Sequence, residues 1–162
     1  MDAPAHILDG AKTLDQLPAD HFMGKSAVLD VTGTEGPLIE PPIIEPYGAF
    51  LERIHYVLLR TGWSSRWGTE SYYKGYPVLS SEAAGWIADF GLKGLGVDRI
   101  SVDAVGSITF PVHATLFEHD RVVIENLTNL ESLPSAGFIL SCFPLKIEDA
   151  DGPPIRAVAI IY

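Results

Sequence analysis

Basic side chains are scarce in this sequence and are not clustered. The chain has 11 Lys and Arg residues against 21 Asp and Glu residues, which gives a formal net charge of −10 at pH 7. Proteins bind the phosphates of nucleic acids with clustered Lys and Arg, and anionic membrane surfaces attract polybasic segments. The composition therefore argues against both a nucleic acid and a membrane as a partner.

Cysteine and long apolar runs are also nearly absent. Cys142 is the single cysteine, so a disulfide within the chain is excluded. It lies in the apolar run "FILSCF", where we expect a small core residue. No apolar run has the length of a membrane span, and the first residues lack the basic and apolar regions of a secretory signal. We therefore expect a cytoplasmic protein.

Hydrophobic residues are abundant, at 47% of the 162 residues, which is enough for a domain with a substantial core. The sequence shows no internal repeat, no low-complexity segment and no change of composition that would mark a domain boundary. We expect residues 1–162 to form a single domain.

Short apolar runs predict the β-strands of this domain. The expected strands cover residues 26–31, 56–62, 96–103, 121–126, 138–147 and 155–162. The last two are almost continuously apolar, which is typical of strands covered on both faces. Four prolines and three glycines in residues 32–48 make regular structure improbable there.

The clearest helix is predicted over residues 80–91. Ser80 or Ser81 can cap its start and Gly91 can end it. An apolar stripe for packing on a sheet recurs at helical spacing: Ala83, Trp86, Ile87 and Phe90. Shorter helices are expected just before residue 56 and over residues 110–120. The strand–helix–strand order between residues 56 and 102 indicates a parallel crossover, so the fold class is α/β with a mixed, mostly buried sheet.

The side chains that could ligate a metal are carboxylates and imidazoles: Asp2, His6, His21, His55, His113, His119 and Glu125. Glu125 ends an apolar strand, so its carboxylate needs a cation, a metal or backbone donors. His113 follows an apolar segment and could share a metal with it. Alternatively, Glu125 caps the turn that follows. The sequence contains neither a Gly-x-Ser-x-Gly nucleophile motif nor a glycine-rich phosphate-binding loop.

Several segments together resemble the cyclase family of metal-dependent amidohydrolases, which includes bacterial kynurenine formamidase and isatin hydrolase. The similar segments are residues 2–31, 58–73, 79–103, 110–134 and 143–160. The resemblance weakens only over residues 32–54. It implies a swivelling β/β/α-like fold and hydrolysis of a C–N amide bond in a small amide or lactam. An arylformamidase and an enzyme that opens a cyclic amide both fit.

The family motif His-x-Gly-Thr-His-x-Asp-x-Pro-x-His is represented only by its end, as Asp2, Pro4 and His6. The resemblance implies that Asp2 bridges two metal ions and that His113 and Glu125 hold one of them. It also implies that His6 is the acid–base catalyst. These ligand types suit Zn²⁺ or Mn²⁺. The domain is thus expected to be N-terminally truncated relative to the family, with impaired activity.

Other interpretations of the sequence stay open. The chain could be a non-catalytic remnant or an interaction protein with an incomplete metal site, or its true start could lie upstream, with both histidines encoded there. Trp63 and Trp67 could form the walls of a pocket for a flat aromatic substrate, or they could cover hydrophobic core. A homodimer or higher homo-oligomer is expected, because missing strands would leave a sheet edge that invites pairing.

Overall fold

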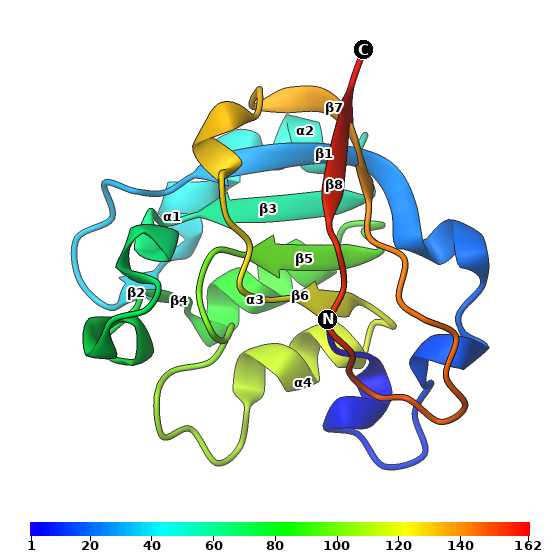
Figure 1. Cartoon of the computed structure of the whole chain (residues 1–162). Coiled ribbons are helices and arrows are strands. Elements are labelled where there is room, and N and C mark those ends of the chain that lie inside the picture. The colour runs from blue at the N-terminus through cyan, green and yellow to red at the C-terminus, as the bar shows by residue number, and fades with distance from the viewer.

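The computed structural model describes residues 1–162, and a six-stranded mixed sheet forms its centre (Figure 1). The strand order is β6-β5-β3-β1-β7-β8. Four neighbouring strands run parallel, whereas β7 is antiparallel to both β1 and β8. Their bounds are β1 Met23–Asp30, β3 Tyr56–Arg60, β5 Gly94–Val97, β6 Val122–Ile124, β7 Ala136–Ser141 and β8 Val158–Ile161. The predicted α/β class with a mixed sheet is confirmed.

Four short α-helices and a small second sheet complete the regular structure. The helices are α1 Pro41–Ile44, α2 Gly48–Leu51, α3 Ser81–Ala88 and α4 Pro111–Phe117, and the second sheet pairs β2 Leu38–Ile39 with β4 Val78–Leu79. Single 3-10 turns are η1 Pro4–His6, η2 Leu14–Gln16, η3 Ala19–Phe22, η4 Glu45–Tyr47, η5 Trp63–Arg66, η6 Glu70–Tyr73 and η7 Leu130–Ser132. None of the helices has the length and apolar character that crossing a bilayer requires.

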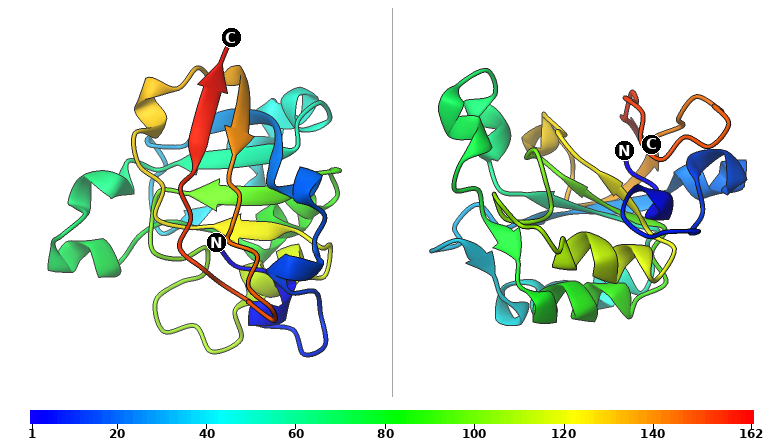
Figure 2. Two further views of the ribbon diagram at one scale, coloured as in Figure 1. Left: turned by 45° about the vertical axis from the view of Figure 1, so that its right-hand side comes forward. Right: turned by 90° about the horizontal axis from the view of Figure 1, so that it is seen from below.

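Two apolar clusters lie on the two faces of the central sheet. Helices α3 and α4 cover one face, as the view from below shows (Figure 2), and the larger cluster of 20 buried residues lies beneath them. On the other face a cluster of 14 buried residues includes side chains from the N-terminal segment, among them Met1, Ala3 and Leu14. The N-terminal segment therefore contributes side chains to the core.

Helix α3 confirms the predicted crossover and its start. Ser80 is the N-cap, and its hydroxyl accepts a hydrogen bond from the Ala83 N–H at 3.2 Å. The helix joins β3 to β5, which pair in parallel. It ends at Ala88, earlier than predicted. Trp86 and Phe90 are only partly buried, so they flank the core face instead of forming its centre.

Four predictions about strands and loops were wrong in part. The strand expected over residues 138–147 is β7, which ends at Ser141, and Phe143 and Leu145 after it are exposed. Residues 32–48, expected to be irregular, contain β2 and short helical turns. The strand expected over residues 96–103 is β5, Gly94–Val97, and the residues after it form a loop. Strand β8 is not covered on both faces, because it is the last strand of the sheet and most of its side chains are exposed.

Candidate metal centre

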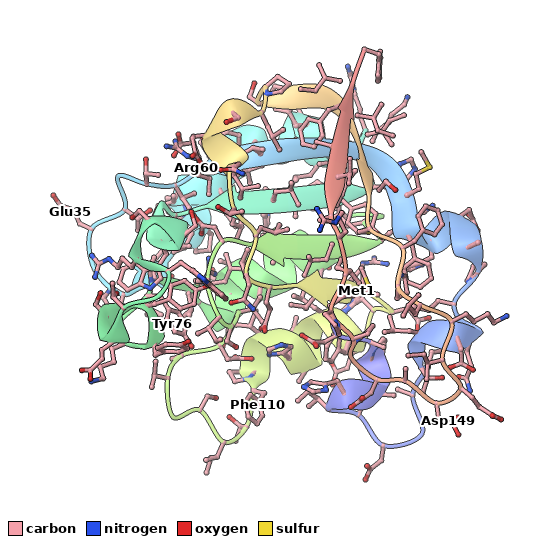
Figure 3. All side chains as sticks on the ribbon, in the orientation of Figure 1. Met1, Glu35, Arg60, Tyr76, Phe110 and Asp149 are labelled. Carbon is pink, nitrogen blue, oxygen red and sulfur yellow. The ribbon has the colours of Figure 1, made fainter.

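Three of the predicted site residues come together beside β6. Glu125 directly follows this strand, His113 lies on α4, and Asp2 pairs with the strand from the side. The Asp2 N–H donates to the Val123 carbonyl at 2.8 Å, and the Val123 N–H donates to the Asp2 carbonyl at 3.1 Å. The neighbouring Met1 is labelled in front of this part of the sheet in Figure 3. One ligand atom from each of the three side chains lies within 4.8 Å of the others.

The imidazole of His113 is held by two carboxylates. Its Nδ1 hydrogen-bonds to Asp103 Oδ2 at 2.6 Å, and its Nε2 lies 3.5 Å from Glu125 Oε1. Asp103 also accepts the backbone N–H groups of Val112 at 2.9 Å and His113 at 3.1 Å, at the start of α4. Metal-ligating histidines commonly donate their second ring N–H to a carboxylate in this way. Nε2 is therefore the nitrogen available to a metal.

The charges of this cluster favour a cation. Burial and the nearby Glu125 carboxylate both raise the pKa of Asp2 above its ordinary value. Burial acts to lower the pKa of His113, but hydrogen bonds with Asp103 and Glu125 raise it to about 9. Carboxylates crowded into a partly buried site stabilise positive charge. One imidazole and two carboxylates are also a donor set that fits a divalent metal ion.

His6 lies beside this cluster, and its partner is Asp151. The His6 Nδ1 is 3.0 Å from Asp151 Oδ2, and 43% of the His6 side chain is exposed. Gly152 lies close to both Asp2 and His6. A Cβ atom at Gly152 would be 2.9 Å from Asp2 Oδ1 and 3.8 Å from His6 Nδ1.

The other histidines considered as ligands lie elsewhere and have partners of their own. His21 Nε2 donates to the Lys93 carbonyl at 3.0 Å. His55 Nδ1 accepts the Lys25 N–H at 3.2 Å, and His119 Nδ1 hydrogen-bonds to the Thr115 carbonyl of α4 at 2.8 Å. None of them is part of the candidate metal centre.

The structure separates the two tryptophans predicted to line a pocket. Trp67, 64% exposed, lines a cavity of about 290 Å³ together with Tyr72 and Asn126. Trp63 is not in the wall of this cavity. Its indole N–H donates to the Tyr72 carbonyl at 2.9 Å, and the Arg66 guanidinium stacks on its ring at 3.9 Å. Trp63 thus holds the loop together.

A larger cavity directly adjoins the candidate metal centre. It has a volume of about 600 Å³, and Glu125 is in its wall. Ten of its sixteen lining residues are hydrophobic, including Leu58, Ile124, Leu127 and Ile155. Sequence reasoning missed this cavity because its wall combines β3, β6 and the segment before β8. It also missed Asp103 and Asp151, since neither has a local pattern that marks it.

Known proteins resemble this chain over nearly its whole length. The sequence model of the family "Putative cyclase" matches residues 1–104. Kynurenine formamidase from Bacillus cereus (strain ATCC 14579) is 33% identical over 159 residues, covering 98% of this chain and 72% of the relative. Kynurenine formamidase from Bacillus anthracis is also 33% identical, with the same coverage.

Solved structures of similar fold belong to the same group of proteins. Isatin hydrolase A from Labrenzia aggregata, bound to benzyl benzoate, superposes with a TM-score of 0.87 at 28% identity, covering 99% of this chain and 71% of that one. An isatin hydrolase bound to the product analogue thioisatinate gives the same TM-score and identity, covering 99% and 70%. A potential metal-dependent hydrolase with cyclase activity superposes with a TM-score of 0.81 at 25% identity, covering 98% and 75%. The chain belongs to the cyclase family of metal-dependent amidohydrolases.

Proposed function

We propose that this protein hydrolyses the C–N amide bond of a small aromatic substrate, either an N-formyl arylamine or a cyclic amide, with a divalent metal held by Asp2, His113 and Glu125. The proposal rests on one observation: the three ligand atoms lie within 4.8 Å of one another. The relatives named kynurenine formamidase and isatin hydrolase support the substrate class. Imidazole and carboxylate ligands favour Zn²⁺ or Mn²⁺.

Each side chain has a distinct role in this proposal. A divalent metal bound here would lower the pKa of a water molecule and polarise the substrate carbonyl. Asp103 fixes the His113 ring so that Nε2 faces Glu125. His6 is partly exposed beside Asp2, and a histidine there can take up a proton and return it to the leaving nitrogen.

The cavity of about 600 Å³ beside Glu125 is the proposed substrate site. Its largely apolar wall suits a flat aromatic group, since small-molecule sites are mostly apolar with a few polar groups that fix orientation. Trp67 belongs to the neighbouring cavity, where it can contact a larger substrate. We assign no substrate contact to Trp63.

Metal binding to the protein, measured by titration calorimetry with Zn²⁺ and with Mn²⁺, tests this proposal directly. Glu125→Gln and His113→Asn should each weaken metal binding strongly. The loss should exceed the roughly 10–100-fold that is typical of changing a residue that only hydrogen-bonds to a metal ligand. His119→Asn is a matched control just after the same helix and should leave binding unchanged, because His119 lies outside the cluster. Equal affinity in all variants would contradict the ligand assignment.

Hydrolysis of N-formylkynurenine and of isatin, followed by absorbance, tests the activity. We expect slow hydrolysis of one of them, lost on chelation and in Glu125→Gln. Full activity that neither a chelator nor Glu125→Gln affects would contradict the proposal. No hydrolysis despite tight metal binding would favour the alternative of a non-catalytic metal-binding protein.

The two further histidines of the family motif provide a second test. Metal sites in hydrolases commonly use three or more protein ligands on a rigid framework, and the family motif has two histidines ahead of the aspartate that corresponds to Asp2. Adding a His-x-Gly-Thr-His segment ahead of this position should therefore raise both metal affinity and the rate of hydrolysis. A segment with both histidines replaced by Ala is the matched control.

A further inference from the structure

The connection between β7 and β8 returns to the first residues of the chain. Figure 2 shows this segment passing close to the N-terminus. The Ala3 N–H donates to the Asp151 carbonyl at 2.7 Å, and the Met1 amine donates to the Pro153 carbonyl at 3.2 Å. Residues 150–153, here called the strap, therefore hold the segment that carries Asp2 and His6.

The strap presents one carboxylate to His6. Asp151 Oδ2 lies 3.0 Å from His6 Nδ1, and the hydrogen bond to His6 is the main reason why the pKa of Asp151 is below its ordinary value. No protein atom hydrogen-bonds to the other ring nitrogen, Nε2. The Asp151 carboxylate can only accept a hydrogen bond, so the ring nitrogen that faces it must carry a proton. The neutral His6 ring therefore has its proton on Nδ1.

The His6–Asp151 pair contributes little to the stability of the fold. The side chains of His6 and Asp151 are 43% and 54% exposed. Exposed ion pairs contribute little to folding because water screens them. The pair can therefore be removed with little effect on the fold, which makes its effect on the site measurable.

Gly152, the next residue of the strap, lies close to the Asp2 carboxylate. A Cβ at Gly152 would be 2.9 Å from Asp2 Oδ1, a distance that real Cβ atoms essentially never show. Gly152 is not among the residues with a positive φ. Its backbone therefore accepts alanine, and only the contact with the Asp2 carboxylate excludes a side chain.

We propose that the strap sets up the candidate active site through two neighbouring residues. Asp151 is a positioning residue that accepts a hydrogen bond from the His6 Nδ1–H and leaves Nε2 to exchange protons with the reacting groups. Gly152 leaves the Asp2 carboxylate free to bind the metal. The role of Asp151 in catalysis rests on the proposed acid–base role of His6, whereas the pairing itself does not.

The tautomer of His6 is the first readout and needs no activity. Long-range ¹H–¹⁵N NMR of the neutral His6 ring should show the proton on Nδ1 in the unmodified protein. In Asp151→Ala it should shift toward the Nε2–H form that unconstrained histidines favour, and in Asp151→Asn, which keeps an acceptor oxygen, it should stay on Nδ1. Asp149→Asn removes an unpaired carboxylate from the same connection and should change nothing. The same tautomer in Asp151→Ala as in the unmodified protein would overturn the inference.

Kinetics and metal binding separate the two residues of the strap. Asp151→Ala should lower kcat for N-formylkynurenine or isatin by about 10–100-fold with an unchanged KM and unchanged Zn²⁺ affinity, and Asp151→Asn should recover part of the loss. Gly152→Ala should instead weaken Zn²⁺ binding and leave the His6 tautomer unchanged. Loss of Zn²⁺ binding in both variants would show a merely structural strap and overturn the inference. If the unmodified protein hydrolyses neither substrate, the proposed function fails while the tautomer measurement still decides the pairing.

Discussion

Arg99 carries a buried charge that has no hydrogen-bond partner. The residue is fully buried, and none of its guanidinium nitrogens has a hydrogen-bond partner. Burial lowers its pKa to about 10. The neighbouring Asp98 carboxylate does not hydrogen-bond to it, because that carboxylate accepts the N–H groups of Thr61 and Gly62 and the Thr61 hydroxyl. An unpaired buried charge destabilises the folded state by several kcal/mol, and a hydrophobic side chain of similar volume carries no such cost.

We therefore expect Arg99→Met to stabilise the protein. The free energy of unfolding, measured by urea denaturation, should rise by about 1–4 kcal/mol, as for other buried charges replaced by apolar residues. Arg60→Met is the control, since Arg60 pairs with Asp30 near the surface and its loss should change stability by about 1 kcal/mol or less. Destabilisation by Arg99→Met would show that the guanidinium has a partner in solution.

At the scale of the element, α3 shows how a helical stripe meets the sheet. Four of its side chains are at least 98% buried: Ala83, Ala84, Ile87 and Ala88. Trp86 and Phe90 contact each other instead, with ring centroids 4.8 Å apart, and the Trp86 ring lies against Gly48. The small alanines let the helix approach the sheet closely, so the bulky aromatic side chains lie at the side of the contact.

Substitutions on α3 should follow this division. Ile87→Ala should lower the free energy of unfolding by about 2–5 kcal/mol, because it leaves a cavity in the core. Phe90→Ala should cost less than the roughly 3–5 kcal/mol of a fully buried phenylalanine, since Phe90 is partly exposed. Chemical denaturation of both variants measures the difference. A larger loss for Phe90→Ala would show that its ring is covered in solution, for example by a second subunit.

At the scale of the whole molecule, the outer edge of the sheet is apolar and unpaired. Strand β8 is the last strand in the order. Exposed apolar side chains lie along it and just after it: Val158, Ile160, Ile161 and Tyr162. Long exposed apolar edge strands readily pair with another chain, and exposed apolar patches commonly mark interfaces. We therefore propose that the protein forms a homodimer or a higher homo-oligomer.

A charge on this edge should disrupt the assembly. Light scattering at micromolar concentration should show an oligomer for the unmodified protein and a smaller species for Ile160→Lys, because lysine on an edge strand opposes pairing. Ile108→Lys adds the same charge at a 90% exposed position in the loop before α4 and should leave the mass unchanged. A monomeric unmodified protein would contradict the proposal.

The sequence by itself determined the features that depend on neighbouring residues. The α/β class, the crossover through α3 and the Ser80 cap follow from apolar periodicity and from residues three or four positions apart. The resemblance to the cyclase family also named Asp2, His113 and Glu125, which the fold brings together. The local features are readable because the interacting groups lie close in the chain, whereas the three distant ligands were named by the family resemblance alone.

Only the tertiary structure decided which distant groups meet. Asp103 hydrogen-bonds to His113 across 10 positions, and Asp151 hydrogen-bonds to His6 across 145. The exposure of β8 likewise depends on its place at the edge of the sheet, which its apolar sequence does not reveal. Strand order and loop paths set these contacts, and both result from the packing of the whole chain rather than from any local pattern.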